Sequence, residues 1–75
     1  MEFNDFIKAF AELFDDTDAS EIKAETVFHE LDEWSSLIGM SVIAFVRTQF
    51  GKAITGKEIR ECNTVKDLYE TIVAK

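Results

Sequence analysis

Two adjacent serines, Ser35 and Ser36, carry the hydroxyl groups with the clearest chemical potential in this 75-residue chain. They follow Trp34 and precede Leu37, where an acidic, irregular stretch gives way to the most apolar helical segment. The unpaired amides and the dipole of a helix N-terminus both favour an anion. We therefore expect Ser36 to be the attachment point of a phosphate-linked prosthetic group. Either serine could supply the oxygen that caps the helix.

The other reactive side chains lack suitable neighbours. His29 stands in an acidic stretch without a patterned partner, so we expect an exposed histidine with no catalytic role. Cys62 is the single cysteine, which excludes an internal disulfide and a CxxC metal site; we expect a small buried residue between the last two helices. No Ser-His, Cys-His or paired-acid arrangement is visible, so we expect the chain not to be an enzyme.

A calcium loop is also excluded. Asp16, Asp18 and Ser20 have the spacing with which such a loop opens. Glu21, however, stands where the loop needs glycine, and Val27 stands where it needs glutamate. We expect no metal site.

Composition and charge limit the class of protein. The length fits one domain, residues 1–75, and 47% hydrophobic residues are enough for a core without disulfides. A net charge of −7 argues against nucleic-acid binding. Residues 1–33 hold eleven acids and two bases, whereas residues 34–75 hold four acids and six bases. No apolar run could span a membrane, and acids follow Met1 where a secretory signal would be basic, so we expect a cytoplasmic location without membrane insertion.

Helical periodicity appears in three long segments. Residues 3–14 and 65–75 each show one apolar stripe, and residues 36–50 are apolar around most of the helix, as a central helix would be. Gly51 should end the middle helix in the left-handed conformation. A fourth, short helix is predicted at 56–61 because Thr55 and Glu58 have capping-box spacing.

The resulting prediction is an all-α fold. Three main helices and one short helix form a small four-helix bundle. A long loop, residues 15–34, joins the first two helices and is pinned to the core by isolated apolar residues. A loop of this length in a small domain is often functional.

These elements and motifs resemble the acyl carrier proteins and their peptidyl and aminoacyl relatives, over nearly the whole chain. The matching residues are Phe28-x-x-Leu31, Trp34-Ser35-Ser36-Leu37, Phe50-Gly51, Ile54 and Thr64-Val65-x-Asp67-Leu68. The family's motif is Asp-Ser-Leu, with the serine esterified to 4′-phosphopantetheine. Ser36 and Leu37 match this motif, and the tryptophan before the serines looks like that of a subset of stand-alone carriers.

The resemblance implies a function and a set of partners. Ser36 would carry 4′-phosphopantetheine, whose thiol holds acyl intermediates as thioesters for fatty-acid or polyketide-type enzymes. The implied partners are a phosphopantetheinyl transferase, an acyl- or aminoacyl-loading ligase, and a ketosynthase or other acyl-processing enzymes, with the carrier itself a monomer. Residues that would line a cavity for a bound acyl chain are, by the same resemblance, Phe28, Val46, Ile54 and Ile59.

The chain departs from the family pattern in two ways. Ser35 stands where the family usually has aspartate, and no acid occurs from Ser35 to Lys57, where many carriers have an acidic docking face. We therefore expect partner contact through Trp34, Ser35, Leu37 and Met40, together with the acidic loop. Two alternatives stay open: an aminoacyl or peptidyl carrier, and an unmodified carrier-like bundle that acts only as an interaction protein.

Overall fold

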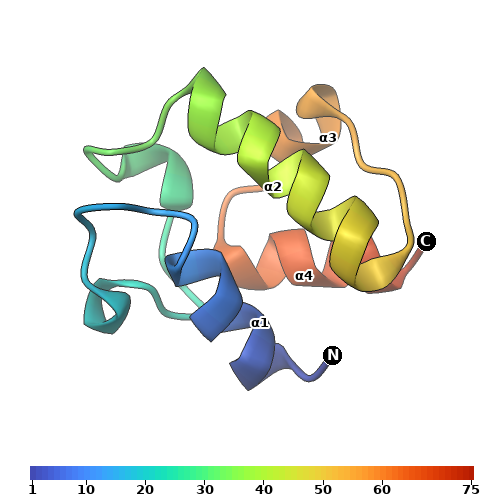
Figure 1. Cartoon of the computed structure of the whole chain (residues 1–75), viewed down its shortest axis with the longest axis horizontal. Coiled ribbons are helices and arrows are strands. Elements are labelled where there is room, and N and C mark those ends of the chain that lie inside the picture. The colour runs from blue at the N-terminus through green and yellow to red at the C-terminus, as the bar shows by residue number, and fades with distance from the viewer.

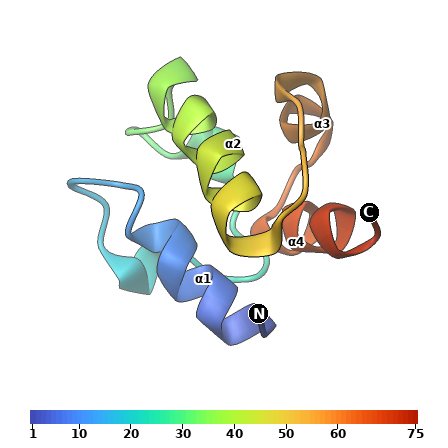
Figure 2. The same cartoon turned by 45° about the vertical axis from the view of Figure 1, so that its right-hand side comes forward.

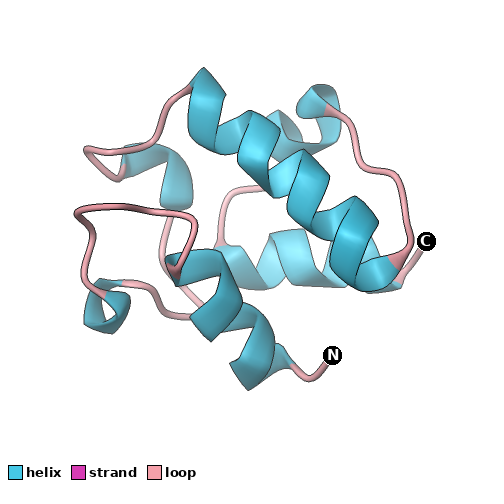
Figure 3. Cartoon of the chain, viewed as in Figure 1, coloured by secondary structure: helices cyan, strands magenta, loops and turns pink.

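A computed structural model, which describes all 75 residues, contains four α-helices and no strand. The helices, in chain order, are α1 (Phe3–Ala11), α2 (Ser36–Phe50), α3 (Gly56–Glu61) and α4 (Val65–Val73). Two 3₁₀ turns, η1 (Ala19–Glu21) and η2 (Phe28–Glu30), lie in the long connection between α1 and α2. The predicted all-α bundle with a short third helix is therefore confirmed (Figure 3).

The helices pack in two contacting pairs. α1 lies against α4, and α3 lies beside α2 (Figures 1 and 2). The long first connection closes the side of the bundle that α3 does not cover (Figure 1). The N-terminus reaches α4, since the Tyr69 hydroxyl donates a hydrogen bond to the Met1 carbonyl at 2.7 Å. This arrangement leaves the first turn of α2 free at one end of the molecule (Figure 1).

The core is entirely apolar. It contains no buried polar or charged side chain, and it draws residues from every helix and from the long loop. The fully buried side chains of largest volume are Phe6, Phe10, Phe28, Leu68, Ile72, Val42, Val46 and Val65. The predicted stripes of the first and last helices are thus core faces.

α1 is shorter than predicted. We expected a helix up to about Phe14, but the α-helix ends at Ala11. The chain then tightens: the amide of Leu13 donates to the Phe10 carbonyl, and that of Phe14 donates to the Ala11 carbonyl, both at 3.1 Å. This tighter winding still buries Phe14, while turning the backbone into the acidic loop.

α2 begins and ends where its sequence predicts. Ser35 is extended, and its hydroxyl oxygen accepts a hydrogen bond from the Ile38 amide at 3.4 Å. Gly51 ends the helix with a φ of 64°, a conformation that side chains other than glycine rarely adopt. Only one stripe of the helix is fully buried, formed by Ile38, Val42 and Val46. Its apolar composition suggested burial on more than one side.

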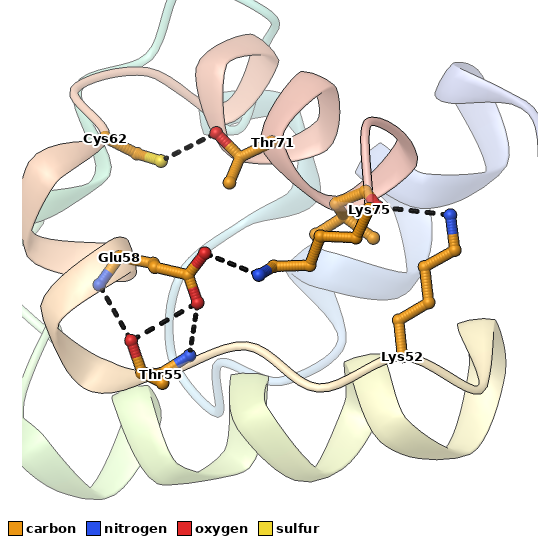
Figure 4. Close-up of polar contacts among 7 residues, drawn as sticks. Lys52, Thr55, Glu58, Cys62, Thr71 and Lys75 are labelled. Carbon is orange, nitrogen blue, oxygen red and sulfur yellow. Dashed lines mark hydrogen bonds and ion pairs between the residues drawn. The ribbon is translucent and has the colours of Figure 1, made fainter.

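α3 and α4 both begin with a capping box, as predicted for α3. Thr55 and Glu58 exchange hydrogen bonds at the start of α3, and Thr64 and Asp67 do so at the start of α4. Figure 4 shows how Glu58 also pairs with Lys75, which ties α3 to the end of the chain. This is the only ion pair in the molecule.

The long loop is held at two places. The Val65 amide donates to the Thr26 carbonyl at 3.1 Å, and the Lys66 amide donates to the Ala24 carbonyl at 3.0 Å. Near the other end of the loop, the Glu33 carboxylate accepts hydrogen bonds from the Asp15 and Asp16 amides. The segment that precedes Ser36 is therefore fixed on both sides.

Candidate functional site

Ser36 is the first residue of α2, and its side chain is exposed. The neighbouring hydroxyls are engaged: that of Ser35 accepts from Ile38, and that of Ser41 donates to the Leu37 carbonyl at 3.2 Å. The Ser36 hydroxyl makes no hydrogen bond within the chain. Of the two serines, Ser35 therefore has the structural role and Ser36 is free to react.

The first turn of α2 is a suitable place for negative charge. Its leading amides have no carbonyl partner inside the helix, as at any helix N-terminus. The helix contains no acid, and its only charged residue, Arg47, lies in the last turn. A phosphate ester on Ser36 would meet the positive end of the helix dipole without a carboxylate on the same helix to repel it.

A pocket of about 360 Å³ opens beside Ser36. It lies between the first half of α2, the residues just before it, and the start of α3. Its walls are formed by His29, Trp34, Ser35, Ser36, Gly39, Met40, Ile43, Gly56, Ile59 and Arg60. No carboxylate lines it. The predicted site residues Trp34, Ser35, Ser36 and Met40 are thus brought together around one hollow.

The cavity implied by the family resemblance is not where the open space lies. Phe28, Val46, Ile54 and Ile59 are all at most 4% exposed and belong to the packed core. Only Ile59 also borders the pocket. The pocket beside Ser36 is therefore a hollow of the surface and not a cavity among these core residues.

His29 differs from the prediction. We expected an exposed histidine, but the ring is half-buried, and Nε2 lies 3.0 Å from both the Ile59 and the Cys62 carbonyl oxygens. Both partners are acceptors, so Nε2 must carry the proton. His29 thereby joins the loop to the end of α3.

Trp34 lines the pocket and is also partly exposed at the surface. Its ring is half-buried and contacts Phe28, with centroids 4.9 Å apart, and His29, at 5.3 Å. On its other side it reaches Phe14 at 6.4 Å. These aromatic contacts hold the residue two positions before Ser36 in a defined place.

Leu37 and Met40 project into solvent. They are 72% and 66% exposed, the highest values among the large apolar side chains. Both lie within the first turns of α2, beside Ser36. The expected exposure of Leu37 is confirmed; its role in partner contact stays a prediction.

The acids of the long loop are partly used for structure. Hydrogen bonds from the Ser20 backbone amide and side chain lower the pKa of Asp18. Partial desolvation raises the pKa of Glu33, but hydrogen bonds from Asp16, Asp15 and Thr17 outweigh it, so the net shift is downward. No group of three or more His, Cys, Asp or Glu side chains is placed to hold a metal ion.

Cys62 is buried, as predicted, and its sulfur lies 3.4 Å from the Thr71 hydroxyl of α4 (Figure 4). Its thiol faces the α3–α4 contact and not the pocket. It has no part in the candidate site.

Sequence reasoning missed five residues of the pocket wall: His29, Gly39, Ile43, Gly56 and Arg60. For His29 and Arg60 no local signal exists, because each reaches the pocket only through the packing of the loop and α3 against α2. Gly39 did offer a signal, since glycine inside a helix usually has a packing reason. A Cβ at Gly39 would lie 3.9 Å from Cζ2 of Trp34 and would narrow the pocket.

Comparisons of the chain with family models, curated proteins and solved structures found no match. In the structure itself, none of the helices has the length and apolar character needed to cross a membrane.

Proposed function

We propose that this chain is an acyl carrier protein whose Ser36 bears 4′-phosphopantetheine. The observation that carries the proposal is the free, exposed Ser36 hydroxyl at the N-terminus of an acid-free helix, inside a motif that resembles the family's attachment site. The group, when bound, supplies a thiol that holds acyl intermediates as thioesters. The proposed location is the cytoplasm, and the proposed state is a monomer.

The residues of the chain fit this group. Ser36 Oγ would attack the phosphorus of the donor, forming one P–O bond as the donor's phosphoanhydride bond breaks and the nucleotide leaves. The proton passes to the phosphopantetheinyl transferase. The resulting charge at the start of α2 is favoured by roughly 0.3–1 kcal/mol. The rigid helix end presents the arm, while Leu37 and Met40 offer apolar contacts to the loading ligase, ketosynthase or other acyl-processing enzymes.

Intact-mass measurement after incubation with a transferase and coenzyme A tests the proposal. We expect the wild-type chain to gain the mass of one arm and Ser36→Ala to gain none. Ser35→Ala is the matched control: it removes the cap, at a cost of about 0.5–2 kcal/mol in helix stability, but should still gain the arm. Modification of Ser36→Ala, or no modification of the wild type by any transferase, would refute the proposal.

A second function is favoured by the exposed Leu37 and Met40 and by Ser35 in place of aspartate. In this alternative the chain is an unmodified bundle that acts by binding a partner. Binding would then be indifferent to Ser36→Ala and sensitive to Leu37→Ala and Met40→Ala. An aminoacyl carrier differs from the leading proposal only in cargo, which ligase assays followed by mass analysis of the holo form would identify.

A further inference from the structure

Arg60 is an unpaired cation in the pocket wall. It makes no ion pair, because the single ion pair of the molecule joins Glu58 and Lys75. A Cβ placed on Gly56 would lie 3.7 Å from Nη1 of Arg60, so the guanidinium folds back over the first turn of α3. That position keeps it in the pocket wall, which Ser36 also lines.

The remaining lining sets the kind of ligand that the pocket accepts. Trp34, Met40, Ile43 and Ile59 provide apolar surface. The Nε2 proton of His29 is already directed at two backbone carbonyls. No carboxylate is present, and Arg60 is the only Lys, Arg, Asp or Glu side chain in the wall. An apolar chain bearing an anion matches such a pocket, whereas a chain ending in an ammonium group would meet uncompensated repulsion.

We propose that this pocket binds the arm-borne ligand and that Arg60 recognises an anionic group on it. The inference rests on the proposed function, because Ser36 would deliver the ligand. Two anions share the required chemistry: the phosphodiester of the arm itself, and a carboxylate at the far end of the acyl cargo. A guanidinium binds either through paired N–H donors. Where the cargo carboxylate is the anion, a cargo with a terminal ammonium is disfavoured.

Trp34 is the only tryptophan and lines the pocket, so its fluorescence reports occupancy directly. The holo protein is prepared unloaded and with three cargoes of similar length: adipoyl, adipamoyl and 6-aminohexanoyl, which end in a carboxylate, an amide and an ammonium. Acrylamide quenching then measures how well each ligand shields Trp34. Free S-adipoyl phosphopantetheine, titrated against the unmodified chain, tests the pocket without attachment.

If the cargo carboxylate is the anion, shielding falls in the order adipoyl, adipamoyl, 6-aminohexanoyl. If the phosphodiester is the anion, the unloaded holo form is already shielded relative to the unmodified chain. In either case Arg60→Gln reduces the ratio of molecules with an occupied pocket to molecules with an empty pocket. The reduction is roughly two- to fivefold, the size expected for a solvent-accessible charge pair. Lys57→Gln, which removes an equal charge from α3 outside the pocket wall, leaves it unchanged.

Equal quenching of wild type and Arg60→Gln in every form, or no shielding in any form, overturns the inference while leaving mass evidence for Ser36 modification intact. Failure of modification overturns the proposed function instead. The titration with free ligand then still decides whether Arg60 recognises an anion in the pocket.

Discussion

His29 shows how a single side chain can hold the long loop against the end of α3, next to the pocket beside Ser36. Its ring lies against Phe28, with centroids 4.3 Å apart, and its Nε2 proton is shared between the carbonyls of Ile59 and Cys62. These carbonyls stand at the end of α3: that of Ile59 also accepts a hydrogen bond from the Cys62 amide at 3.2 Å, whereas that of Cys62 has no backbone donor. The imidazole therefore supplies the donor that the Cys62 carbonyl lacks, adds a second one to the Ile59 carbonyl, and fixes one wall of the pocket.

Removing this donor should be costly. We expect His29→Ala to lower the free energy of unfolding by about 1–3 kcal/mol, because the Cys62 carbonyl loses its hydrogen-bond donor and the Ile59 carbonyl loses one of its two. Urea denaturation followed by circular dichroism measures the loss. His29→Gln is the matched variant, since its amide can place an N–H near the same carbonyls, and it should recover part of the stability. Equal stability of wild type and His29→Ala would contradict the role assigned here.

At the scale of elements, α2 depends on two glycines with opposite roles. Gly51 ends the helix with positive φ, and nothing lies within 4 Å of the Cβ that a larger residue would place there. Gly39 is inside the helix, where the same added Cβ makes only ordinary contact with Trp34. The positive φ at position 51 requires glycine, whereas glycine at position 39 leaves space in the pocket.

Alanine at these two positions should change stability in opposite directions. Gly51→Ala forces a left-handed conformation on alanine and should cost about 1–2 kcal/mol. Gly39→Ala improves helix propensity and should stabilise the chain by about 0.5–1 kcal/mol, while narrowing the pocket. Thermal unfolding of the two variants and the wild type under identical conditions measures whether each substitution raises or lowers the stability. A stabilising Gly51→Ala would show that the end of α2 is not held as described.

For the molecule as a whole, carboxylates that accept hydrogen bonds at the surface should set the response to acid. Three carboxylates have a pKa below the ordinary value: Asp18, Glu33 and Glu58. The pKa of Glu58 is lowered mainly by its contact with the Lys75 ammonium. A group whose pKa is lowered by folding contributes stability above its unfolded pKa, and that contribution is lost as pH falls through the folded value.

We therefore expect stability to decline below about pH 4.5, from the ordinary values of 4.5 for glutamate and 3.8 for aspartate. Glu33→Gln removes one of these contributions, so its stability should fall less steeply with acid than that of the wild type. Unfolding midpoints in urea at a series of pH values measure both curves. Glu25→Gln, a substitution of an exposed loop acid whose side chain makes no hydrogen bond, is the control and should follow the wild-type slope.

The two halves of the chain differ in their content of acidic residues. Eleven of the fifteen acids lie before Trp34, and some of their carboxylates accept hydrogen bonds from backbone amides of the loop. Asp18 and Glu21 form a capping box, and the Glu33 carboxylate accepts hydrogen bonds from the Asp15 and Asp16 amides. The acidic loop is therefore partly a structural device. Its charge does not extend into the pocket wall beside Ser36, which holds a single cation.

Local sequence determined most of the elements of this protein. The bounds of α2 follow from Ser35 and Gly51, and those of α3 from Thr55 and Glu58, because capping and left-handed glycine are interactions between near neighbours. The placement of Ser36 at a helix N-terminus follows for the same reason. The core faces of α1 and α4 follow from apolar spacing alone.

Only the tertiary structure decided what surrounds Ser36. Arg60 is far from His29 and Trp34 in sequence and meets them through packing of the loop and α3 against α2. The shorter end of α1 likewise reflects where Phe14 must lie to enter the core, not a local stop signal. Side-chain partners thirty residues apart, such as His29 and Ile59, leave no periodic trace in a sequence. The place of the Ser36 hydroxyl at a helix N-terminus could thus be predicted from its neighbours, and the pocket beside it could not.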